Sequence, residues 1–512
     1  MLAAAGATLL VLLLWARFMA GVGGDLTAQW AWADFAARHP GSAVDFAWYG
    51  GMHPASYSLL APYLMALLGV PAVAVAATTL SSALLAQLLV RSRVRRPLPV
   101  ALWGAFSLCC NVAAGRVTFA LGLMFGLAAV VAAGTDRAAP WRRVAAGAVL
   151  ALLATLGSPV AGLFVEVAAA ALLLTGRRRT GWALAVPPPL VVLGTALLFP
   201  FNGVDPIEIS TVLICVGCAV AVAVFSPRPW RAVRAGTAVY ALGAVLTWVF
   251  STPIGGNVQR LALLFASVAL LAALCSGLAR SRRRTAALLA CFTATAYWVV
   301  GANVVGIPAP SGARHGTALV AELHQLHAER SRLEAVPMRN HWEAWGLVPA
   351  AQLARGWNRQ ADIERNPLFY DGTLTEASYH DWLRRWAVGY VVLPVSATDI
   401  AGKEEAALVS GGPSWLQEVW RDDNWRLFRF TDALPLAEPS STVEQADATG
   451  LTLTVAAAGP VLLRVPWSPW LSSHGPAGAC LTRDGDWTRL TATAPGEYRI
   501  DAQYTWPRGT PC

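Results

Sequence analysis

One acidic side chain near the start of the chain is the first candidate for chemistry. Asp25 follows a hydrophobic segment in the run Gly-Gly-Asp-Leu-Thr-Ala-Gln, residues 23–29, and it is one of seven acidic residues among the first 306. A carboxylate beside long apolar segments costs free energy to keep, and such residues commonly serve a function. We therefore assign Asp25 a candidate catalytic role.

The segment around Asp25, residues 23–58, is dense in polar and aromatic side chains. A carboxylate can take the proton of an attacking hydroxyl group, and aromatic faces can stack on sugar rings. Together these residue types suit glycosyl transfer, with Asp25 as the base. The other candidates are three substrate-binding residues and two secondary acids: Trp48, Tyr49, His53, Asp34 and Asp45. The alternative is an ordinary hydrated loop in which Asp25 caps a surface helix.

Two arginines lie at expected turns between apolar segments. Arg116 ends the run Asn-Val-Ala-Ala-Gly-Arg, and Arg260 ends the run Gly-Gly-Asn-Val-Gln-Arg that contains Asn257. A guanidinium can bind a phosphate through two parallel hydrogen bonds, so these three residues are candidate ligands of a leaving phosphate. The two glycines before Asn257 are expected to leave backbone N–H groups free. The alternative for each arginine is that it extends to lipid headgroups.

Composition indicates a membrane protein. Of 512 residues, 56% are hydrophobic and only 13% are charged, against about 25% charged in soluble domains. The net charge of +9 is uneven, because residues 1–306 carry 21 basic and 7 acidic side chains whereas residues 307–512 carry 18 and 23. A basic excess confined to the hydrophobic half indicates membrane topology and argues against a nucleic-acid partner.

Arginine clusters divide the hydrophobic half, and each intervening stretch can hold two helices of about 20 residues. By the positive-inside rule the clusters face the cytoplasm. We expect about eleven spans in the cytoplasmic membrane, with residues 23–58 and everything after 306 on the outer face. Residues 55–91 form either two short spans or one span and a surface helix. The clusters are Arg91/Arg93/Arg95/Arg96, Arg137/Arg142/Arg143, Arg177–Arg179, Arg228/Arg231/Arg234 and Arg280/Arg282/Arg283/Arg284.

The remaining residues form a different, extracytoplasmic region in two parts. Residues 307–410 read as an α/β layer, with strands at 333–336 and 390–395 and helices at 341–355 and 376–387. Residues 411–512 read as a β-sandwich with short strands at 415–420, 425–430, 451–456, 461–465, 488–492 and 498–502. Cys480 and Cys512 are an even pair that fits one disulfide in an oxidising compartment.

Three segments of this region interleave aromatic, amide and arginine side chains: 339–343, 355–360 and 366–372. Their side chains suit either carbohydrate binding or packing at the headgroup level of the membrane. His341 and Glu343 lack the second histidine of a helical zinc motif. The sequence predicts no metal site and leaves the cofactor unknown, with a divalent metal possible.

These features resemble the GT-C superfamily, membrane glycosyltransferases that take sugars from polyprenyl-phosphate carriers. The likeness consists of a first span, an outer loop that opens with Asp25, many further spans and a C-terminal extracytoplasmic domain. The segment Trp48–Ser58 resembles the stretch by which such proteins re-enter the membrane. The resemblance implies that Asp25 activates the acceptor. Many members carry two adjacent acids at this point, whereas Leu26 follows Asp25 here.

A second resemblance covers nearly the whole chain. The runs at 115–122, 255–260 and 366–373 look like an actinobacterial family of integral membrane proteins that are often labelled as transporters. The sequence thus favours a membrane glycosyltransferase whose partners are the bilayer, a polyprenyl-phosphate sugar donor and a cell-envelope glycan acceptor. A transporter or flippase, and a non-catalytic membrane scaffold, are the alternatives.

Overall fold

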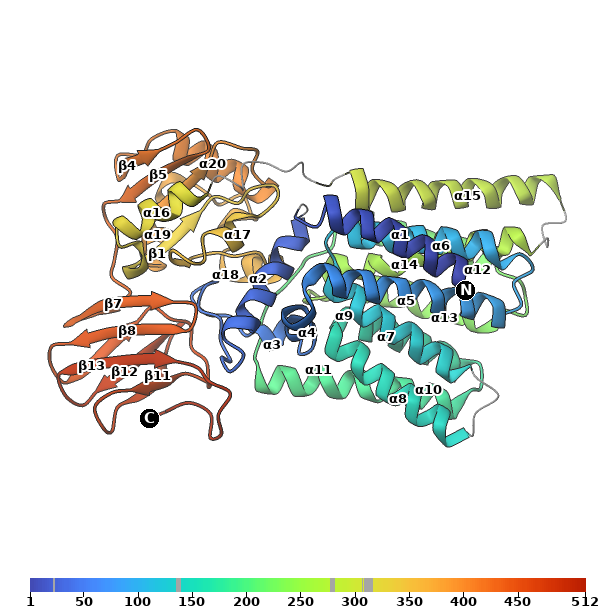
Figure 1. Cartoon of the computed structure of the whole chain (residues 1–512), viewed down its shortest axis with the longest axis horizontal. Helices are drawn as coiled ribbons and strands as arrows, with labels where there is room; N and C mark the ends of the chain where they lie inside the picture. Colours follow the sequence, from blue (N-terminus) through green and yellow to red (C-terminus); the bar gives the residue numbers. More distant parts are fainter. Residues whose placement is uncertain (22–23, 135–139, 277–280, 306, 308–315) are drawn as a thin grey trace. The chain divides into compact units, whose positions relative to one another are not determined.

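A computed structural model describes residues 1–21, 24–134, 140–276, 281–305, 307 and 316–512 (Figure 1). The chain divides into two compact units. The helical unit comprises Met1–Gln29 and Ser56–Ile307, and the mixed unit comprises Trp30–Ala55 and Pro308–Cys512. The predicted loop start at residue 23, the predicted boundary at 306, and the cluster members Arg137 and Arg280 lie outside the described residues.

The helical unit consists mainly of apolar helices, several of which begin with a proline in the first turn. In Figure 1 they run roughly alongside one another. The helices are α1 (Leu2–Phe18), the start of α2 (Gly24–Arg38), the end of α3 (Pro54–Tyr57), α4 (Ala61–Leu68), α5 (Val70–Arg91), α6 (Pro97–Ala113), α7 (Val117–Ala133), α8 (Pro140–Gly157), α9 (Pro159–Leu174), α10 (Arg178–Ala185), α11 (Pro187–Leu198), α12 (Ile209–Phe225), α13 (Arg231–Val249), α14 (Gln259–Cys275) and α15 (Arg282–Val300), with the turns η1 (Gly255–Val258) and η2 (Gly301–Val305).

Five helical segments of the described chain are long and apolar enough to cross a membrane, namely Val70–Arg91, Arg178–Leu198, Arg231–Val249, Gly255–Cys275 and Arg282–Val305. The shorter apolar helices are α1, α6, α7, α9 and α12. Helix α8 belongs to neither set, so the count of about eleven spans stays a prediction. In the stretch 55–91, α4 has 8 residues and α5 has 22, which favours one span and one short helix.

Polar contacts between helices supplement the apolar core of this unit. The Thr8 hydroxyl donates to Ser82 at 2.8 Å and joins α1 to α5. The indole N–H of Trp103 donates to Ser267 at 2.9 Å and joins α6 to α14. Such hydrogen bonds satisfy polar groups that an apolar environment cannot and hold neighbouring helices in register.

A five-stranded sheet with the order β2-β1-β3-β5-β4 forms the first part of the mixed unit. Strands β1 (Arg332–Ala335), β2 (Gln352–Leu353) and β3 (Val388–Pro394) are parallel, whereas β5 (Trp425–Phe430) and β4 (Leu416–Arg421) are antiparallel. The helical elements around it are α16 (Thr317–Gln325), η4 (Ala328–Arg330), α17 (Glu343–Gly346), α18 (Arg359–Arg365), η5 (Pro367–Phe369), α19 (Glu376–Arg385), η6 (Ile400–Gly402) and α20 (Lys403–Ser410).

Two predictions about this sheet need correction. The expected helix at 341–355 is only the four residues of α17, followed by β2. Gly346 and Pro349 interrupt the helical pattern there, since proline cannot donate a helical hydrogen bond. The expected boundary at 411 falls inside the layer, because β4 and β5 complete the five-stranded sheet and do not join the β-sandwich.

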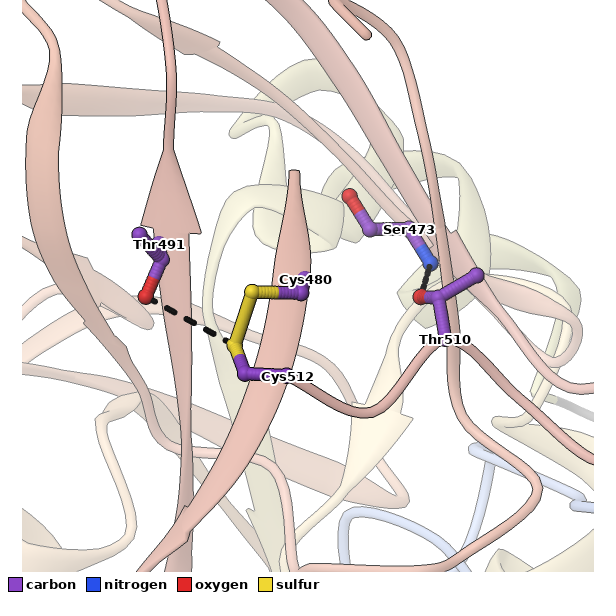
Figure 2. Close-up of a disulfide and its surroundings, with 5 residues drawn as sticks. All are labelled: Ser473, Cys480, Thr491, Thr510 and Cys512. Atoms are coloured by element: carbon purple, nitrogen blue, oxygen red, sulfur yellow. Dashed lines mark hydrogen bonds between the residues drawn. A yellow bond between two sulfur atoms is a disulfide. The ribbon is translucent and has the colours of Figure 1, made fainter. Parts of the chain in front are cut away.

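Two antiparallel four-stranded sheets, with the orders β10-β13-β8-β7 and β11-β12-β9-β6, follow. Cys480 and Cys512 form a disulfide, as the sequence indicated (Figure 2). The final residues lie along β11, where the N–H of Leu481 donates to the Thr510 carbonyl at 2.9 Å. The strands are β6 (Ala437–Glu438), β7 (Ser441–Asp447), β8 (Gly450–Val455), β9 (Gly459–Leu463), β10 (Ser472–His474), β11 (Cys480–Asp484), β12 (Trp487–Ala492) and β13 (Gly496–Asp501).

Candidate functional site

The structure brings three of the predicted site residues together in the helical unit. Asp25 lies in the first turn of α2. Its Oδ2 is 3.6 Å from Nε of Arg116 and 3.9 Å from Nη2 of Arg260. The Asp25 side chain is 35% exposed and each arginine is 19% exposed. This group, Asp25 with Arg116 and Arg260, is named the ion triad here. It is open enough for a ligand to reach the carboxylate.

A close backbone contact positions Arg116. The preceding residue, Gly115, has a φ of +83°, and a Cβ there would lie 2.3 Å from the backbone N of Leu26. Only glycine permits both the left-handed conformation and this approach. The turn between α6 and α7 therefore packs directly against the start of α2. Nη1 of Arg116 donates to Oδ1 of Asn303 at 2.6 Å, which fixes the other end of the guanidinium.

Arg260 is the second residue of α14, directly after the turn η1. Its guanidinium lies over the ring of Phe119 at 5.3 Å, a cation–π contact that orients the charge. The prediction that the backbone N–H groups preceding Arg260 are free is wrong. The N–H of Gly256 donates to Oδ2 of Asp205 at 3.0 Å, and that of Asn257 donates to the Ile254 carbonyl at 2.9 Å. The Asn257 side chain makes no hydrogen bond within the described residues.

The ion triad carries two guanidinium groups for one carboxylate. At 3.6 and 3.9 Å its contacts are longer than hydrogen bonds. Nε of Arg116 is buried and has no hydrogen-bond acceptor among the residues that the structure describes. A buried donor without an acceptor is costly. The triad therefore favours a further anionic oxygen beside the arginines.

The triad has polar neighbours that were not among the predicted site residues. Gln29, one helical turn after Asp25, accepts from the N–H of Thr118 at 3.2 Å and donates to the Tyr57 hydroxyl at 2.9 Å. The spacing of four residues on one helix face was the available signal for Gln29. Thr118, Tyr57 and the Asn303 that binds Arg116 are ordinary polar residues whose positions only the fold reveals.

Trp48 and Tyr49 belong to the mixed unit and are 1% and 0% exposed. The Trp48 indole donates to the Ala344 carbonyl at 2.7 Å. The Tyr49 hydroxyl donates to the Asn358 carbonyl at 3.1 Å, and Arg365 donates to the Tyr49 carbonyl at 3.0 Å. Buried rings with protein partners cannot stack on a sugar. We therefore correct their assignment from substrate binding to the folding of residues 30–55 into this unit.

The remaining loop candidates also have protein partners in the mixed unit. The Trp345 indole donates to Asp34 at 2.6 Å. Asp45 accepts from the N–H of Ala47 at 2.9 Å, and burial raises the pKa of this carboxyl to about 7. His53 contacts the Ala43 carbonyl at 2.8 Å, and burial lowers its pKa to about 4. These contacts assign Asp34, Asp45 and His53 to the fold of the loop.

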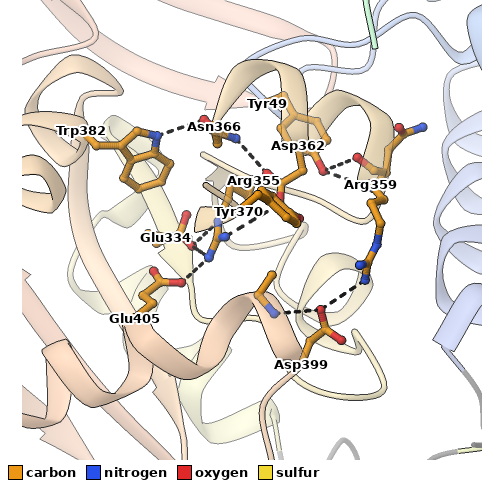
Figure 3. Close-up of polar contacts among 12 residues, drawn as sticks. Tyr49, Glu334, Arg355, Arg359, Asp362, Asn366, Tyr370, Trp382, Asp399 and Glu405 are labelled. Atoms are coloured by element: carbon orange, nitrogen blue, oxygen red, sulfur yellow. Dashed lines mark hydrogen bonds and ion pairs between the residues drawn. The ribbon is translucent and has the colours of Figure 1, made fainter. Parts of the chain in front are cut away.

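A buried ionic cluster includes residues of the segments 355–360 and 366–372, for which the sequence allowed either carbohydrate binding or packing (Figure 3). Arg355 donates to Glu334 at 2.7 and 2.9 Å and also to Glu405. Burial raises the pKa of Glu334 well above its usual range. Asp362 accepts from the Tyr370 hydroxyl at 2.6 Å. With side chains 0–7% exposed, this Arg355 cluster is a structural core and not a sugar-binding surface.

Comparison with known proteins completes the description. Among the described residues, no group of three His, Cys, Asp or Glu side chains could hold a metal ion. A search of curated proteins finds no match. Residues 438–512, which hold β7 to β13, match a domain of unknown function (DUF8823). Among solved structures, the chain is similar to the arabinofuranosyltransferase AftD from Mycobacteria, with a TM-score of 0.46 and 12% identity; the match covers 98% of this chain but only 60% of the length of AftD.

Proposed function

We propose that this chain is a membrane glycosyltransferase that transfers a sugar from a polyprenyl-phosphate carrier to a glycan acceptor of the cell envelope. Asp25 is the general base, and Arg116 and Arg260 hold the phosphate of the donor. The observation that carries the proposal is the ion triad itself: a partly exposed carboxylate between two guanidinium groups in a unit of apolar helices.

Each member of the triad has a defined part in the proposed reaction. The acceptor hydroxyl gives its proton to Asp25 as its oxygen bonds to the anomeric carbon. The bond from that carbon to the phosphate oxygen breaks, and its electron pair leaves with the polyprenyl phosphate. Arg116 and Arg260 stabilise the charge that develops on this phosphate. A single displacement inverts the configuration at the anomeric carbon.

The location of the site is part of the proposal. The disulfide between Cys480 and Cys512 is typical of an oxidising compartment, and the arginine clusters are typical of cytoplasmic ends of spans. Both support a mixed unit outside the cytoplasmic membrane, with Asp25 at the outer ends of the helices.

Binding and turnover of the purified protein in lipid nanodiscs test the proposal. Farnesyl phosphate, a short polyprenyl phosphate, should bind, whereas farnesol should bind at least tenfold more weakly because two arginine contacts to phosphate are lost. Arg260→Gln should remove this preference, and Arg283→Gln, an exposed arginine elsewhere in the unit, should keep it. Equal binding of the two lipids to the unaltered protein contradicts the proposal.

A transfer assay then examines the catalytic step. Polyprenyl-phosphate monosaccharides of different sugars serve as donors, and envelope glycan fragments serve as acceptors. Asp25→Asn should lower transfer by at least about a hundredfold while the protein stays folded. Full transfer by this variant excludes Asp25 as the base.

A further inference from the structure

A second cationic site lies at the turn between α12 and α13, outside the ion triad. An open surface cavity of about 550 Å³ is lined there by Ala223, Arg228, Arg231, Arg234 and Ala235, and its three arginines are solvent-exposed. Three of the five lining residues are arginines, so the surface of this cavity selects for negative charge.

Among the described residues, no carboxylate forms an ion pair with these arginines. No ion pair involves Arg228, Arg231 or Arg234 in the described part of the chain. The sequence also contains no acidic residue from Ile209 to Val305, which spans α12 to α15. A fourth arginine adds to the charge, because Nη2 of Arg284 donates to the carbonyl of Val224 at 3.2 Å, next to the cavity residue Ala223.

Helix stability does not explain the positions of these charges. Arg231 and Arg234 lie in the first turn of α13, which has no acidic residue there and no capping side chain. The N-terminal end of a helix is electrostatically positive, so basic residues at this end destabilise the helix. The positive-inside rule explains an excess of basic residues in cytoplasmic loops, but it does not explain why three of them line one cavity.

We propose that this arginine cavity binds a phosphate group, and that the phosphate belongs to the headgroup of an anionic membrane lipid. Guanidinium groups match phosphate oxygens, and the electrostatically positive N-terminal end of α13 also favours an anion. We assign the phosphate to a lipid because of where the cavity lies. It is at the start of α13, which is among the helices long enough to cross the membrane and is largely exposed along its apolar length. Basic pockets beside spans suit such headgroups.

Lipid retention on the full chain tests the cavity. The protein is purified in detergent, mixed with phosphatidylglycerol or phosphatidylcholine, and examined by native mass spectrometry. The variant R228Q/R231Q/R234Q removes the cavity charges. The matched control, R177Q/R178Q/R179Q, removes three arginines from another predicted cytoplasmic cluster that does not line the cavity. The melting temperature of each variant shows that it is folded.

The unaltered protein and the control should retain phosphatidylglycerol in preference to phosphatidylcholine. The cavity variant should bind phosphatidylglycerol roughly a hundredfold more weakly, since each basic residue near an anionic lipid contributes about a fivefold gain in affinity. A parallel titration with inorganic phosphate identifies the source of the group. Stabilisation by phosphate alone, lost in the cavity variant, supports a phosphate site but assigns it to a soluble anion. Equal loss of lipid in both triple variants, or no loss in either, overturns the proposal.

Discussion

Nε of Arg116 points toward Oδ2 of Asp25 at 3.6 Å but makes no hydrogen bond to it. The two groups attract each other without satisfying the buried donor. A phosphate oxygen from a donor lipid could complete this hydrogen bond and would compete with Asp25 for both arginines. Under the proposed function, donor binding therefore weakens the hold of the arginines on the carboxylate just when it must accept a proton.

This competition gives a prediction for Asp25→Asn. The variant removes the negative charge that opposes phosphate binding, so farnesyl phosphate should bind as tightly as to the unaltered protein or more tightly. Transfer should fall by about 10²–10⁴-fold, the usual contribution of a general base. Fluorescence titration and the transfer assay measure the two effects. Weaker phosphate binding in the variant would mean that Asp25 helps to hold the donor.

Gly115→Ala tests how the triad is assembled. The added Cβ would meet the Leu26 backbone at 2.3 Å in a left-handed conformation, so the turn that carries Arg116 must move. We expect a lower melting temperature, with a cost of about 1–3 kcal/mol, and weaker binding of farnesyl phosphate. Gly217→Ala is the control, because a Cβ there meets nothing within 4 Å inside α12. Binding that is equally preserved in both variants would show that the position of Arg116 does not depend on this contact.

The sequence was informative about the triad because hairpin ends can be located from apolar runs and their breaks. Asp25, Arg116 and Arg260 were each placed at such an end, and hairpin ends at the same end of a helical bundle lie near one another. Asn303 and Thr118 could not be found this way. Their polar groups carry no distinctive pattern, and their role depends on helix packing.

The aromatic and polar side chains of the loop 23–58 were interpreted as part of a sugar site, whereas the structure shows most of them packed into the mixed unit. The difference has a physical reason. Aromatic and polar side chains close together in sequence are equally typical of a sugar site and of a segment that packs into a distant domain. Trp48 is buried through contacts with residues about 300 positions later. Likewise, β4 and β5 have the alternation of sandwich strands, and only their pairing with β3 assigns them to the other sheet.

The Arg355 cluster predicts that substitutions at two arginines of the mixed unit differ greatly in their effect on its stability. Arg355→Met leaves Glu334 and Glu405 buried without their cation, which should destabilise the unit by about 3–5 kcal/mol. Arg359→Met should change stability by about 1 kcal/mol or less, since Arg359 is 40% exposed and 3.4 Å from Asp399. Denaturant unfolding, monitored by tryptophan fluorescence, measures the free energy of unfolding of each variant. Similar losses in both variants would contradict a structural role for the cluster.

Asp45 and His53 predict opposing effects of pH on the stability of the mixed unit. The native pKa of Asp45, about 7, exceeds its unfolded value of about 3.9, so its contribution to stability decreases as pH rises from about 4 to about 7. The native pKa of His53, about 4, is below its unfolded value of about 6.5, so its contribution decreases as pH falls from about 6.5 to about 4.

Single substitutions should therefore expose each effect separately in melting curves between pH 4 and pH 8. Asp45→Asn removes the effect of this carboxyl, so the melting temperature should increase more with pH between about 4 and 7 than that of the unaltered protein does. His53→Gln removes the effect of this imidazole, so the melting temperature should increase less, or decrease more, with pH between about 4 and 6.5 than that of the unaltered protein does. The exposed substitution Asp381→Asn should keep the profile of the unaltered protein. If the melting temperatures of Asp45→Asn and His53→Gln changed with pH in the same way, Asp45 and His53 would not control the pH response. The burial of these two groups in the mixed unit would then have no effect on how its stability depends on pH.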